Sequence, residues 1–341
     1  MTKRVLSTKE QVLSRLLDQH GDYVSGDELA QQVGVSRESI WKAIQKLKAD
    51  GHHILSKKKT GYAYQQSGQL EEAVLAKWLK KYDTQLLPLP EIHLFDTIDS
   101  TQTYAKEYVG KHPSLQPRAF IAREQSGGYG RQGRDFYSPK NAGLYVSLAL
   151  PIQTGEDLVP SLLTTSAAVA LVNGLQAFFP QQDFKLKWVN DLILRQHKVG
   201  GVITEGVFNF ESQQYSAVII GFAINVLPVQ WPAALASKVG SVLLEDEENV
   251  DLNQLLAKIL IELLEMAEIY RSGCYLGKYR DLSILIDHAI TVKVGTETLT
   301  GVVQDISDQG GLVLLNSETG RSQTLYAGEV TKVKLLENLN L

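Results

Sequence analysis

Cysteine is almost absent from this chain of 341 residues, since Cys274 is its one thiol. A single cysteine excludes an internal disulfide framework and a relay between two thiols, and it fits a reducing cytosol. Long apolar segments are also lacking, because no stretch approaches the roughly 18 residues that a membrane-spanning helix needs without a polar break. The amino-terminal residues lack the apolar core of a secretory signal. We therefore expect a cytoplasmic protein without membrane contact.

Metal-binding clusters and activated nucleophiles are lacking as well. The seven histidines are scattered along the chain, and no Gly-x-Ser-x-Gly motif marks a nucleophile elbow. The neighbours His52 and His53 would point to opposite sides of an extended strand. The sequence therefore predicts no metal site built from a cluster of protein side chains.

The net charge of −4 conceals an uneven distribution along the chain. Residues 1–65 contain 11 basic and 7 acidic residues, whereas the rest of the chain contains 23 basic and 31 acidic ones. A basic head on an acidic body indicates a nucleic-acid-binding module at the amino terminus. The length suggests two or three domains, each with enough residues for a core of its own.

The basic segment has the pattern of a helix-turn-helix followed by a hairpin wing. Ser7 and Ser25 each precede a glutamate by three positions, which is the capping box that begins a helix. Ser36 caps a third helix, apolar on one side and largely polar and basic on the other, and an alternating segment then turns at three lysines. This combination favours binding of double-stranded DNA over a helical domain with a solvated basic face. The residues predicted to contact DNA are Ser36, Arg37, Ser39, Trp41, Lys42, Gln45 and Lys46 in the helix and Lys57, Lys58 and Lys59 in the wing.

Residues 124–134 read Glu-Gln-Ser-Gly-Gly-Tyr-Gly-Arg-Gln-Gly-Arg and carry the clearest chemical signal. Glycine lets backbone N–H groups approach a ligand closely, and the guanidinium groups of Arg131 and Arg134 suit carboxylate or phosphate oxygens. A dinucleotide fingerprint would need a helix that opens on the last glycine, and residues 134–139 do not begin one. We interpret the segment as a mobile clamp for an anion; the alternative is a glycine-rich surface loop.

Beyond residue 90, short strand-like runs alternate with helical ones in an α+β pattern. Polar clusters interrupt this pattern at 99–102, 187–191, 198–205 and 220–225, and each alone has a structural explanation such as a cap or a turn. Together with the glycine–arginine segment they supply cations, carboxamides and a carboxylate, which suit a phosphorylated ligand. The predicted strands are 92–95, 119–124, 144–150, 186–189, 202–205 and 216–222, and the predicted helices are 71–81, 100–108, 160–179 and 251–270.

These motifs resemble, over nearly the whole chain, the bifunctional biotin–protein ligases that also repress biotin operons. Tyr129 stands where an arginine is common in that family, Val189 replaces a proline, and Phe222-Ala223 replaces a glycine-containing pair. The matching segments are Asp99-Ser-Thr, Glu124–Arg134, Lys187-Trp-x-Asn-Asp191, Lys198-x-Gly-Gly-x-x-x-Glu205, Gly221-x-x-Ile-Asn-Val226, Tyr279-Arg280 and Gly328-Glu-Val330.

The resemblance implies an α+β multidomain fold with three parts. Residues 1–66 would form a winged helix-turn-helix. Residues 67–272 would form a linker helix and a mixed-sheet catalytic domain of the biotin/lipoate-ligase type. Residues 273–341 would form a small C-terminal domain, an SH3-like β-barrel.

The resemblance also implies ATP-dependent activation of biotin to biotinyl-5′-adenylate in the presence of Mg²⁺. Transfer to a lysine of a biotin carboxyl carrier domain would follow. The ligand-bound form would be a homodimer that represses transcription from operator DNA. One alternative is a related lipoate ligase, which would lack the glycine–arginine segment and the winged module. The other is a ligand-sensing repressor without catalysis, against which the charged residues of the motifs argue.

The residues to which the resemblance assigns these roles fall into three sets. Lys198 would bridge the biotin carboxylate and the α-phosphate, and Asp191 would help to deprotonate the acceptor lysine. The catalytic set comprises Lys198, Arg131, Lys187 and Asp191. The biotin-binding set comprises Ser100, Thr101, Gln102, Gln125, Gly128, Tyr129, Gly130, Arg131 and Lys198. The ATP-binding set comprises Arg131, Arg134, Lys187, Asn190 and Asn225.

Overall fold

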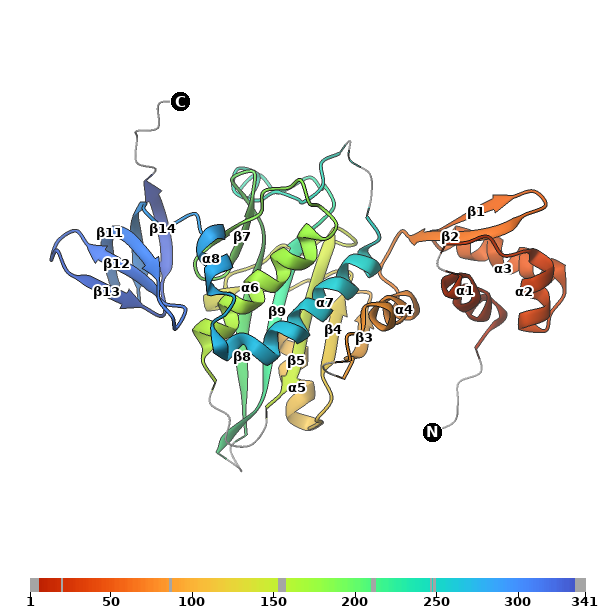
Figure 1. Cartoon of the computed structure of the whole chain (residues 1–341), viewed down its shortest axis with the longest axis horizontal. Helices are drawn as coiled ribbons and strands as arrows, with labels where there is room; N and C mark the ends of the chain where they lie inside the picture. Colours follow the sequence, from red (N-terminus) through yellow and green to blue (C-terminus); the bar gives the residue numbers. More distant parts are fainter. Residues whose placement is uncertain are drawn as a thin grey trace. The chain divides into compact units, whose positions relative to one another are not determined.

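The computed structural model describes residues 6–19, 21–85, 88–152, 158–209, 213–245, 247 and 250–334 (Figure 1). Residue contacts divide the chain into two compact units. The first is Met1–Tyr82 with Val250–Ala257, and the second is Asp83–Asn249 with Lys258–Leu341. The helix predicted at 71–81 belongs to the first unit by its contacts. The three domain boundaries drawn from the sequence stay a prediction.

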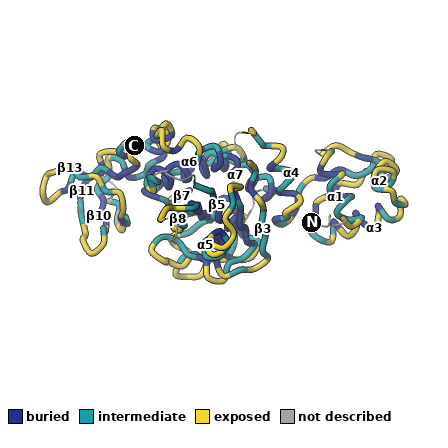
Figure 2. Tube along the Cα trace, turned by 90° about the horizontal axis from the view of Figure 1, so that it is seen from below, coloured by how far each residue is buried: buried dark blue, intermediate teal, exposed yellow. Residues whose placement is uncertain are grey.

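The first unit contains the predicted helix-turn-helix with its hairpin wing. Its core consists of apolar residues that recur with helical spacing and are fully buried, among them Val12, Leu16, Ile40 and Ile44. Figure 2 shows this buried interior between exposed outer surfaces. The elements are α1 (Thr8–Asp18), α2 (Gly26–Val33), α3 (Arg37–Ala49), β1 (His52–Lys57), β2 (Gly61–Ser67) and α4 (Glu72–Tyr82).

The caps explain where the first two helices begin. Ser7 Oγ accepts a hydrogen bond from Glu10 N at 3.3 Å, and Glu10 Oε2 accepts one from Ser7 N at 2.7 Å, so this capping box is complete. Ser25 Oγ likewise accepts from Glu28 N at 3.1 Å. The Glu28 carboxylate, however, accepts from Gln32 Nε2 at 3.2 Å. Of the second predicted capping box, the contacts of the described residues therefore contain the bond to the Ser25 hydroxyl and not the return bond to the Glu28 carboxylate.

A close backbone contact holds the wing against the helices. Val24 and Tyr62 exchange two backbone hydrogen bonds of 2.9 Å, which add a third short segment to the β1–β2 hairpin. Gly61 has a φ of +120°, and a Cβ there would lie 2.0 Å from Val24 O. Only glycine fits this position. The contact leaves residues 57–59 exposed at the tip of the hairpin.

A buried polar cluster of the first unit joins the wing to the start of two helices. His52 Nε2 lies 3.1 Å from Glu71 Oε1, and Asn253 Oδ1 accepts a hydrogen bond of 2.7 Å from Glu71 N. Asp251 Oδ1 accepts from two backbone N–H groups at the start of α7 (Leu252–Ile269), at 2.9 and 3.3 Å. Burial raises the pKa of Asp251, and its hydrogen bonds only partly oppose the rise.

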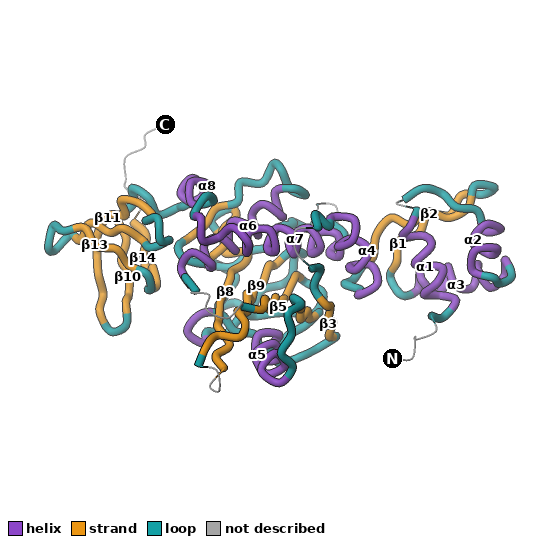
Figure 3. Tube along the Cα trace, turned by 60° about the horizontal axis from the view of Figure 1, so that its bottom comes forward, coloured by secondary structure: helices purple, strands orange, loops and turns teal. Residues whose placement is uncertain are grey.

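A mixed seven-stranded sheet forms the centre of the second unit, as the resemblance implies. Its order is β3-β4-β5-β9-β8-β7-β6, in which β3 and β4 are parallel and the other neighbours antiparallel. Helix α5 lies on one face, and α6 lies on the other (Figure 3). The elements are β3 (Glu91–Phe95), α5 (Thr101–Lys111), β4 (Arg118–Ala122), β5 (Gly143–Pro151), α6 (Pro160–Gln176), β6 (Lys185–Lys187), β7 (Asp191–Leu194), β8 (His197–Asn209), β9 (Gln214–Asn225) and α8 (Leu276–Leu282), with 3-10 turns at Arg131–Gly133 and Tyr270–Ser272.

Strand alternation decides which side chains face α5. Ser147 and Glu205 both bind Gln102 of α5, so they share one face of the sheet. Thr204 lies on the opposite face, where its hydroxyl is 2.6 Å from that of Thr164 on α6. The polar residues near α5 are therefore separated from the α6 side by one layer of backbone.

Three features of the second unit differ from the sequence prediction. The predicted strand 186–189 ends at Lys187, because the chain turns there and returns as β7, antiparallel to β6. Helix α8 is too short to show a clear apolar period. The hairpin of β8 and β9 is longer than predicted, since its strands continue beyond their apolar runs into exposed positions.

The carboxy-terminal part of the second unit is a small antiparallel β-domain, which confirms the small C-terminal β domain that the resemblance implies, as far as the described residues reach. The strands pair in the order β13-β12-β11-β10-β14. Closure into an SH3-like barrel stays a prediction. The elements are β10 (Ala289–Val294), β11 (Glu297–Ile306), β12 (Leu312–Asn316), β13 (Ser322–Leu325) and β14 (Glu329–Lys334).

The buried carboxyl group of Asp251 generates a prediction about pH. Because folding raises its pKa, the folded state favours the protonated acid, and stability is lost as pH rises from the ordinary pKa through the raised value. Asp251→Asn keeps one accepting oxygen and removes the charge. We expect the variant to match the wild type at low pH and to be more stable by about 1–3 kcal/mol at pH 8.

Urea denaturation of both proteins at the two pH values, followed by circular dichroism, measures the difference. A stability difference that does not change with pH would contradict the assignment of a buried carboxyl group whose pKa is raised.

Candidate active site

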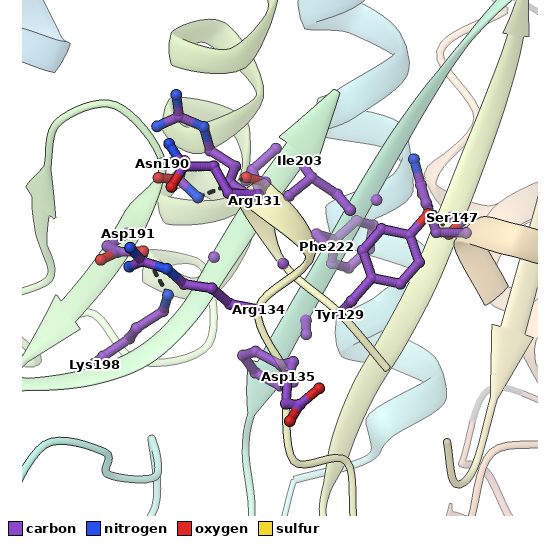
Figure 4. Close-up of a pocket in the computed structure, with 18 of the residues that line it drawn as sticks. Tyr129, Arg131, Arg134, Asp135, Ser147, Asn190, Asp191, Lys198, Ile203 and Phe222 are labelled. Carbon is purple, nitrogen blue, oxygen red and sulfur yellow. Dashed lines mark hydrogen bonds and ion pairs between the residues drawn. The ribbon is translucent and has the colours of Figure 1, made fainter. Parts of the chain in front are cut away.

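One cavity of about 210 Å³ in the second unit brings together most of the residues that the sequence singles out (Figure 4). Its wall is formed by the start of α5, part of the glycine–arginine loop, the turn between β6 and β7, and parts of β8 and β9. The predicted residues on this wall are Ser100, Thr101, Gln102, Gln125, Tyr129, Gly130, Arg131, Arg134, Lys187, Asn190, Asp191 and Lys198.

The adjacent strands β7 and β8 place a carboxylate and an ammonium group side by side on this wall. Lys198 Nζ lies 2.6 Å from Asp191 Oδ1, and the dashed line in Figure 4 marks the pair. The two side chains are 35% and 24% exposed, so both are partly shielded from water. An ammonium group has three N–H donors. Lys198 can therefore keep its partner and still donate to an anion in the cavity.

The start of α5 and strand β5 form a polar floor. Thr101 N donates to Gln125 Oε1 at 2.9 Å, and Ser147 Oγ donates to Gln102 Oε1 at 2.8 Å. Thr101 and Gln102 are 3% exposed and Ser147 is 1% exposed. Ser100 Oγ accepts from Thr103 N at 3.3 Å and caps the helix. The floor is a set of hydroxyl and amide groups whose orientation is fixed before any ligand binds.

The glycine–arginine loop, residues 124–134, folds back on itself over this floor. Gly130 N donates to Arg134 O at 2.7 Å, and Gly127 N donates to Asp99 O at 2.8 Å. Gly133 and Gln132 both have positive φ, at +69° and +61°, in the tight turn at the tip. The turn directs the two arginine side chains toward the cavity, as the sequence predicts for an anion clamp.

The β-domain supplies acceptors to three of the cations. Lys187 Nζ donates to Val330 O at 2.9 Å, and Arg131 Nη1 donates to Gly328 O at 3.3 Å. Arg134 makes a two-point ion pair with Glu329. The Gly328-Glu-Val330 motif therefore belongs to the site, although the sequence assigns no role to it.

Burial and charge shift two pKa values in this cluster. Burial lowers the pKa of Arg131, an effect that the charges of Asp191 and Glu329 oppose. The hydrogen bond from Arg134 lowers the pKa of Glu329. The carboxylate of Glu329 is therefore ionised at neutral pH, and the ion pair would be lost only as pH falls through the lowered value.

Two predicted residues do not line the cavity. Asn225 is 1% exposed, and its Nδ2 donates to Gly240 O at 3.2 Å. The amide therefore fastens the segment after β9, and a direct contact of Asn225 with the nucleotide stays a prediction. Gly128 acts through its lack of a side chain, because a Cβ there would lie 2.8 Å from Gln125 Nε2.

Several site residues are missed by the sequence reasoning. Ser147 belongs to the floor, and its one signal is a lone hydroxyl within the apolar run 144–150. Glu205 contacts Gln102 and Tyr129, yet the motif that contains it gives no hint of those partners.

Comparison with known proteins decides the family. Residues 94–225 match the model of the biotin/lipoate A/B protein ligase family, residues 8–63 match an HTH domain, and residues 285–333 match the biotin protein ligase C terminal domain. The chain belongs to the biotin protein ligase family. Its helix-turn-helix places it in the class of these ligases that carries a DNA-binding module.

Relatives of this biotin protein ligase cover nearly the whole chain. The bifunctional ligase/repressor BirA of Escherichia coli strain K12 is 26% identical over 315 residues, which are 92% of this chain and 94% of that protein. BirA of Bacillus subtilis strain 168 is 28% identical over 332 residues, which are 92% of this chain and 95% of that protein. The biotin protein ligase from Aquifex aeolicus in complex with biotin and ATP superposes with a TM-score of 0.59 at 22% identity, covering 71% of this chain and 98% of that chain. This last likeness supports the fold.

The helix-turn-helix of this ligase exposes the residues predicted to contact DNA, except Ser39, which is half-buried. Trp41 is 53% exposed on α3, and the wing lysines are exposed. Two of the cations already have carboxylate partners on the surface, Arg37 with Asp27 at 2.8 Å and Lys42 with Glu38 at 2.7 Å. Because exposed ion pairs contribute little, phosphate groups can replace these partners at low cost.

Two further observations concern metals and membranes. Within the described ranges, no group of three or more His, Cys, Asp or Glu residues is placed to hold a metal ion. No helix in the described part of the chain is long and apolar enough to span a bilayer.

Proposed function

We propose that this chain activates biotin with ATP and transfers it to a lysine of a biotin carboxyl carrier domain. We further propose that the adenylate-bound form dimerises in the cytoplasm and represses transcription from operator DNA. The observation that carries the proposal is the convergence of Lys198, Lys187 and the glycine–arginine loop on one cavity with a polar floor. The family membership and the helix-turn-helix support both halves of it.

The first step joins two anions and therefore needs fixed positive charge. Bringing a carboxylate to about 4 Å from a phosphate charge costs roughly 1–4 kcal/mol at effective dielectrics of about 80 to 20. In this proposal the biotin carboxylate attacks the α-phosphorus of ATP, forms a mixed anhydride and expels pyrophosphate. Lys198 donates to the carboxylate and the α-phosphate, while Lys187, Arg131 and Arg134 stabilise the charge of the departing phosphates.

The polar floor would orient biotin for this attack. Thr101, Gln102 and Gln125 present hydroxyl and amide groups to the ureido ring, whose N–H and C=O groups they complement. Tyr129 and Gly130 would cover the ligand from the loop. Once the adenylate has formed, the loop excludes water from an anhydride that water would hydrolyse.

The second step transfers the biotinyl group to an amine. The uncharged acceptor lysine attacks the anhydride carbonyl, an amide bond forms, and AMP leaves. Asp191, already at the cavity wall beside Lys198, would accept the proton from the incoming ammonium group. Mg²⁺ enters with ATP and would be held by the ATP phosphates together with the side-chain oxygens of Asp191 and Asn190, since this hard cation prefers oxygen ligands. It would neutralise part of the phosphate charge.

A lipoate ligase is the main alternative enzyme, and the matching family includes both activities. The winged module and the glycine–arginine loop favour biotin. Incubation with Mg-ATP, a carrier domain and either labelled biotin or labelled lipoate distinguishes them. Transfer of neither label would support a sensing repressor without catalysis.

Lys198→Ala should remove the cation that joins the two reacting anions. We expect the rate of adenylate formation to fall at least about 100-fold, the usual loss for one preorganised donor. Release of labelled pyrophosphate measures it. Lys111→Ala, which removes an exposed lysine at the end of α5, serves as the matched control. Adenylate formation at an unchanged rate in Lys198→Ala would refute the assignment.

Gly221→Ala should damage biotin binding without altering a charge. A Cβ at Gly221 would lie 2.4 Å from Gln102 Oε1, so the Gln102 amide must leave its two hydrogen bonds. We expect the dissociation constant for biotin to rise about 10-fold or more, as for the loss of one or two hydrogen bonds. Calorimetric titration measures it, with Gly110→Ala as the control, because a Cβ there meets nothing within 4 Å. Equal affinities in the two variants would contradict the floor assignment.

Replacing Lys57, Lys58 and Lys59 by alanine tests the wing. Each lysine that neutralises a phosphate adds about 0.9 to the slope of log affinity against log salt. We expect the slope to fall by up to about 2.7 per wing, with an unchanged preference among operator sequences. Gel shifts over a range of salt concentrations measure both quantities. A changed sequence preference would mean that the wing reads bases.

A further inference from the structure

Glu205, on β8, binds three side chains that come from two other parts of the second unit. Its Oε2 accepts from Gln102 Nε2 at 2.8 Å and from Tyr129 Oη at 3.2 Å. Its Oε1 accepts from Lys106 Nζ at 3.0 Å. Gln102 belongs to the cavity floor, and Tyr129 belongs to the loop that covers it. One carboxylate therefore joins the floor to the loop.

The direction of the hydrogen bonds in the floor follows from the number of available protons. Each hydroxyl has one proton. If Ser147 donates to Gln102 Oε1 at 2.8 Å, it can only accept from the Thr101 hydroxyl, which lies 3.0 Å away. The Thr101 hydroxyl also lies 3.1 Å from Gln125 Oε1, to which Thr101 N donates at 2.9 Å. The Ser147 hydroxyl and the Gln102 amide thus form a path that ends on Glu205, and such chains strengthen one another, whereas Gln125 Nε2 donates outside this path to Ser138 Oγ at 3.0 Å.

We propose that Glu205 is a positioning residue that couples closure of the glycine–arginine loop to the orientation of the cavity floor. A carboxylate can only accept, so it fixes the Gln102 amide with its nitrogen toward β8 and its oxygen toward Ser147. The same oxygen holds the hydroxyl of Tyr129, which keeps the loop over the cavity. The retention of biotinyl-adenylate in the cavity rests on the proposed function. The coupling between the loop and the floor does not, because it involves only residues of the chain.

Lys106 keeps the carboxylate in place. It lies one helical turn beyond Gln102 on α5, and its Nζ also lies 5.5 Å from the centre of the Tyr129 ring. The ammonium group therefore contacts both Glu205 and Tyr129. The side chains of Lys106 and Glu205 are 36% and 35% exposed, so the pair is a surface clamp that water can reach when the loop opens.

The loop offers a readout that needs no ligand. The bonds from Gly130 N to Arg134 O at 2.7 Å and from Phe136 N to Gly128 O at 2.8 Å lie within the segment 128–136. The bond from Gly127 N to Asp99 O at 2.8 Å joins the loop to the segment before α5 and breaks when the loop lifts from it. Hydrogen exchange of the Gly127 amide therefore reports the population of the open loop. The measurement is independent of whether the protein makes an adenylate.

Tyr129→Phe removes one hydroxyl and keeps the ring beneath Lys106. In the ligand-free protein we expect exchange in peptides covering 126–136 to quicken about threefold to tenfold, as for one hydrogen bond to a charged, partly exposed acceptor. Glu205→Gln should do the same. Exchange in the double variant should be slower than the product of the two single effects would give, because both substitutions remove the same interaction. The matched control is Tyr326→Phe, in which the tyrosine is 55% exposed.

A second measurement follows the release of preformed adenylate. Both single variants should release it about threefold to tenfold faster, while the midpoint of thermal unfolding stays as in the wild type. A purely structural role for Glu205 would lower the midpoint instead. If neither variant changes exchange in 126–136, the proposal is overturned. A wild type that makes no adenylate would refute the proposed function, and the exchange result would still decide the coupling.

Discussion

Four positive side chains converge on one cavity, and each has an acceptor, which for two of them is a carboxylate and for two a backbone carbonyl. Lys198 has Asp191, Lys187 has a carbonyl of β14, Arg131 has Gly328 O, and Arg134 has a carboxylate of the β-domain. Charges of one sign repel one another, and the two carboxylates offset part of this repulsion. The remaining positive charge leaves the site ready for two anions.

The architecture follows from that constraint. The sheet supplies rigid neighbours, so that β7 and β8 fix a carboxylate beside a lysine. The loop supplies backbone donors and guanidinium groups above the floor, and the β-domain holds those guanidinium groups in place. The strands thus set the reacting groups, and in the proposed mechanism the loop controls access of water. Most of the hydroxyl and amide floor accordingly belongs to a helix and a strand, and only Gln125 comes from the start of the loop.

Local signals made much of this predictable from the sequence. Ser7 with Glu10, and Gly61 between alternating residues, mark the helix-turn-helix and its wing, because caps and turns depend on near neighbours. The glycine–arginine motif and Lys198 were likewise recognisable from residue type and spacing. The links from Ser147 and Glu205 to Gln102 were not, since they depend on which strands become neighbours. For the same reason the sequence does not reveal that the Asn225 amide donates to Gly240 O, and its contact with a nucleotide stays a prediction.

A crystal structure of the protein with biotinyl-5′-adenylate is the most direct test of the shared anion site. The convergence of cations predicts Lys198 Nζ within about 3 Å of an α-phosphate oxygen, with residues 129–134 closed over the anhydride. A phosphate bound away from Lys198, or an anhydride open to solvent beneath a displaced loop, would contradict it.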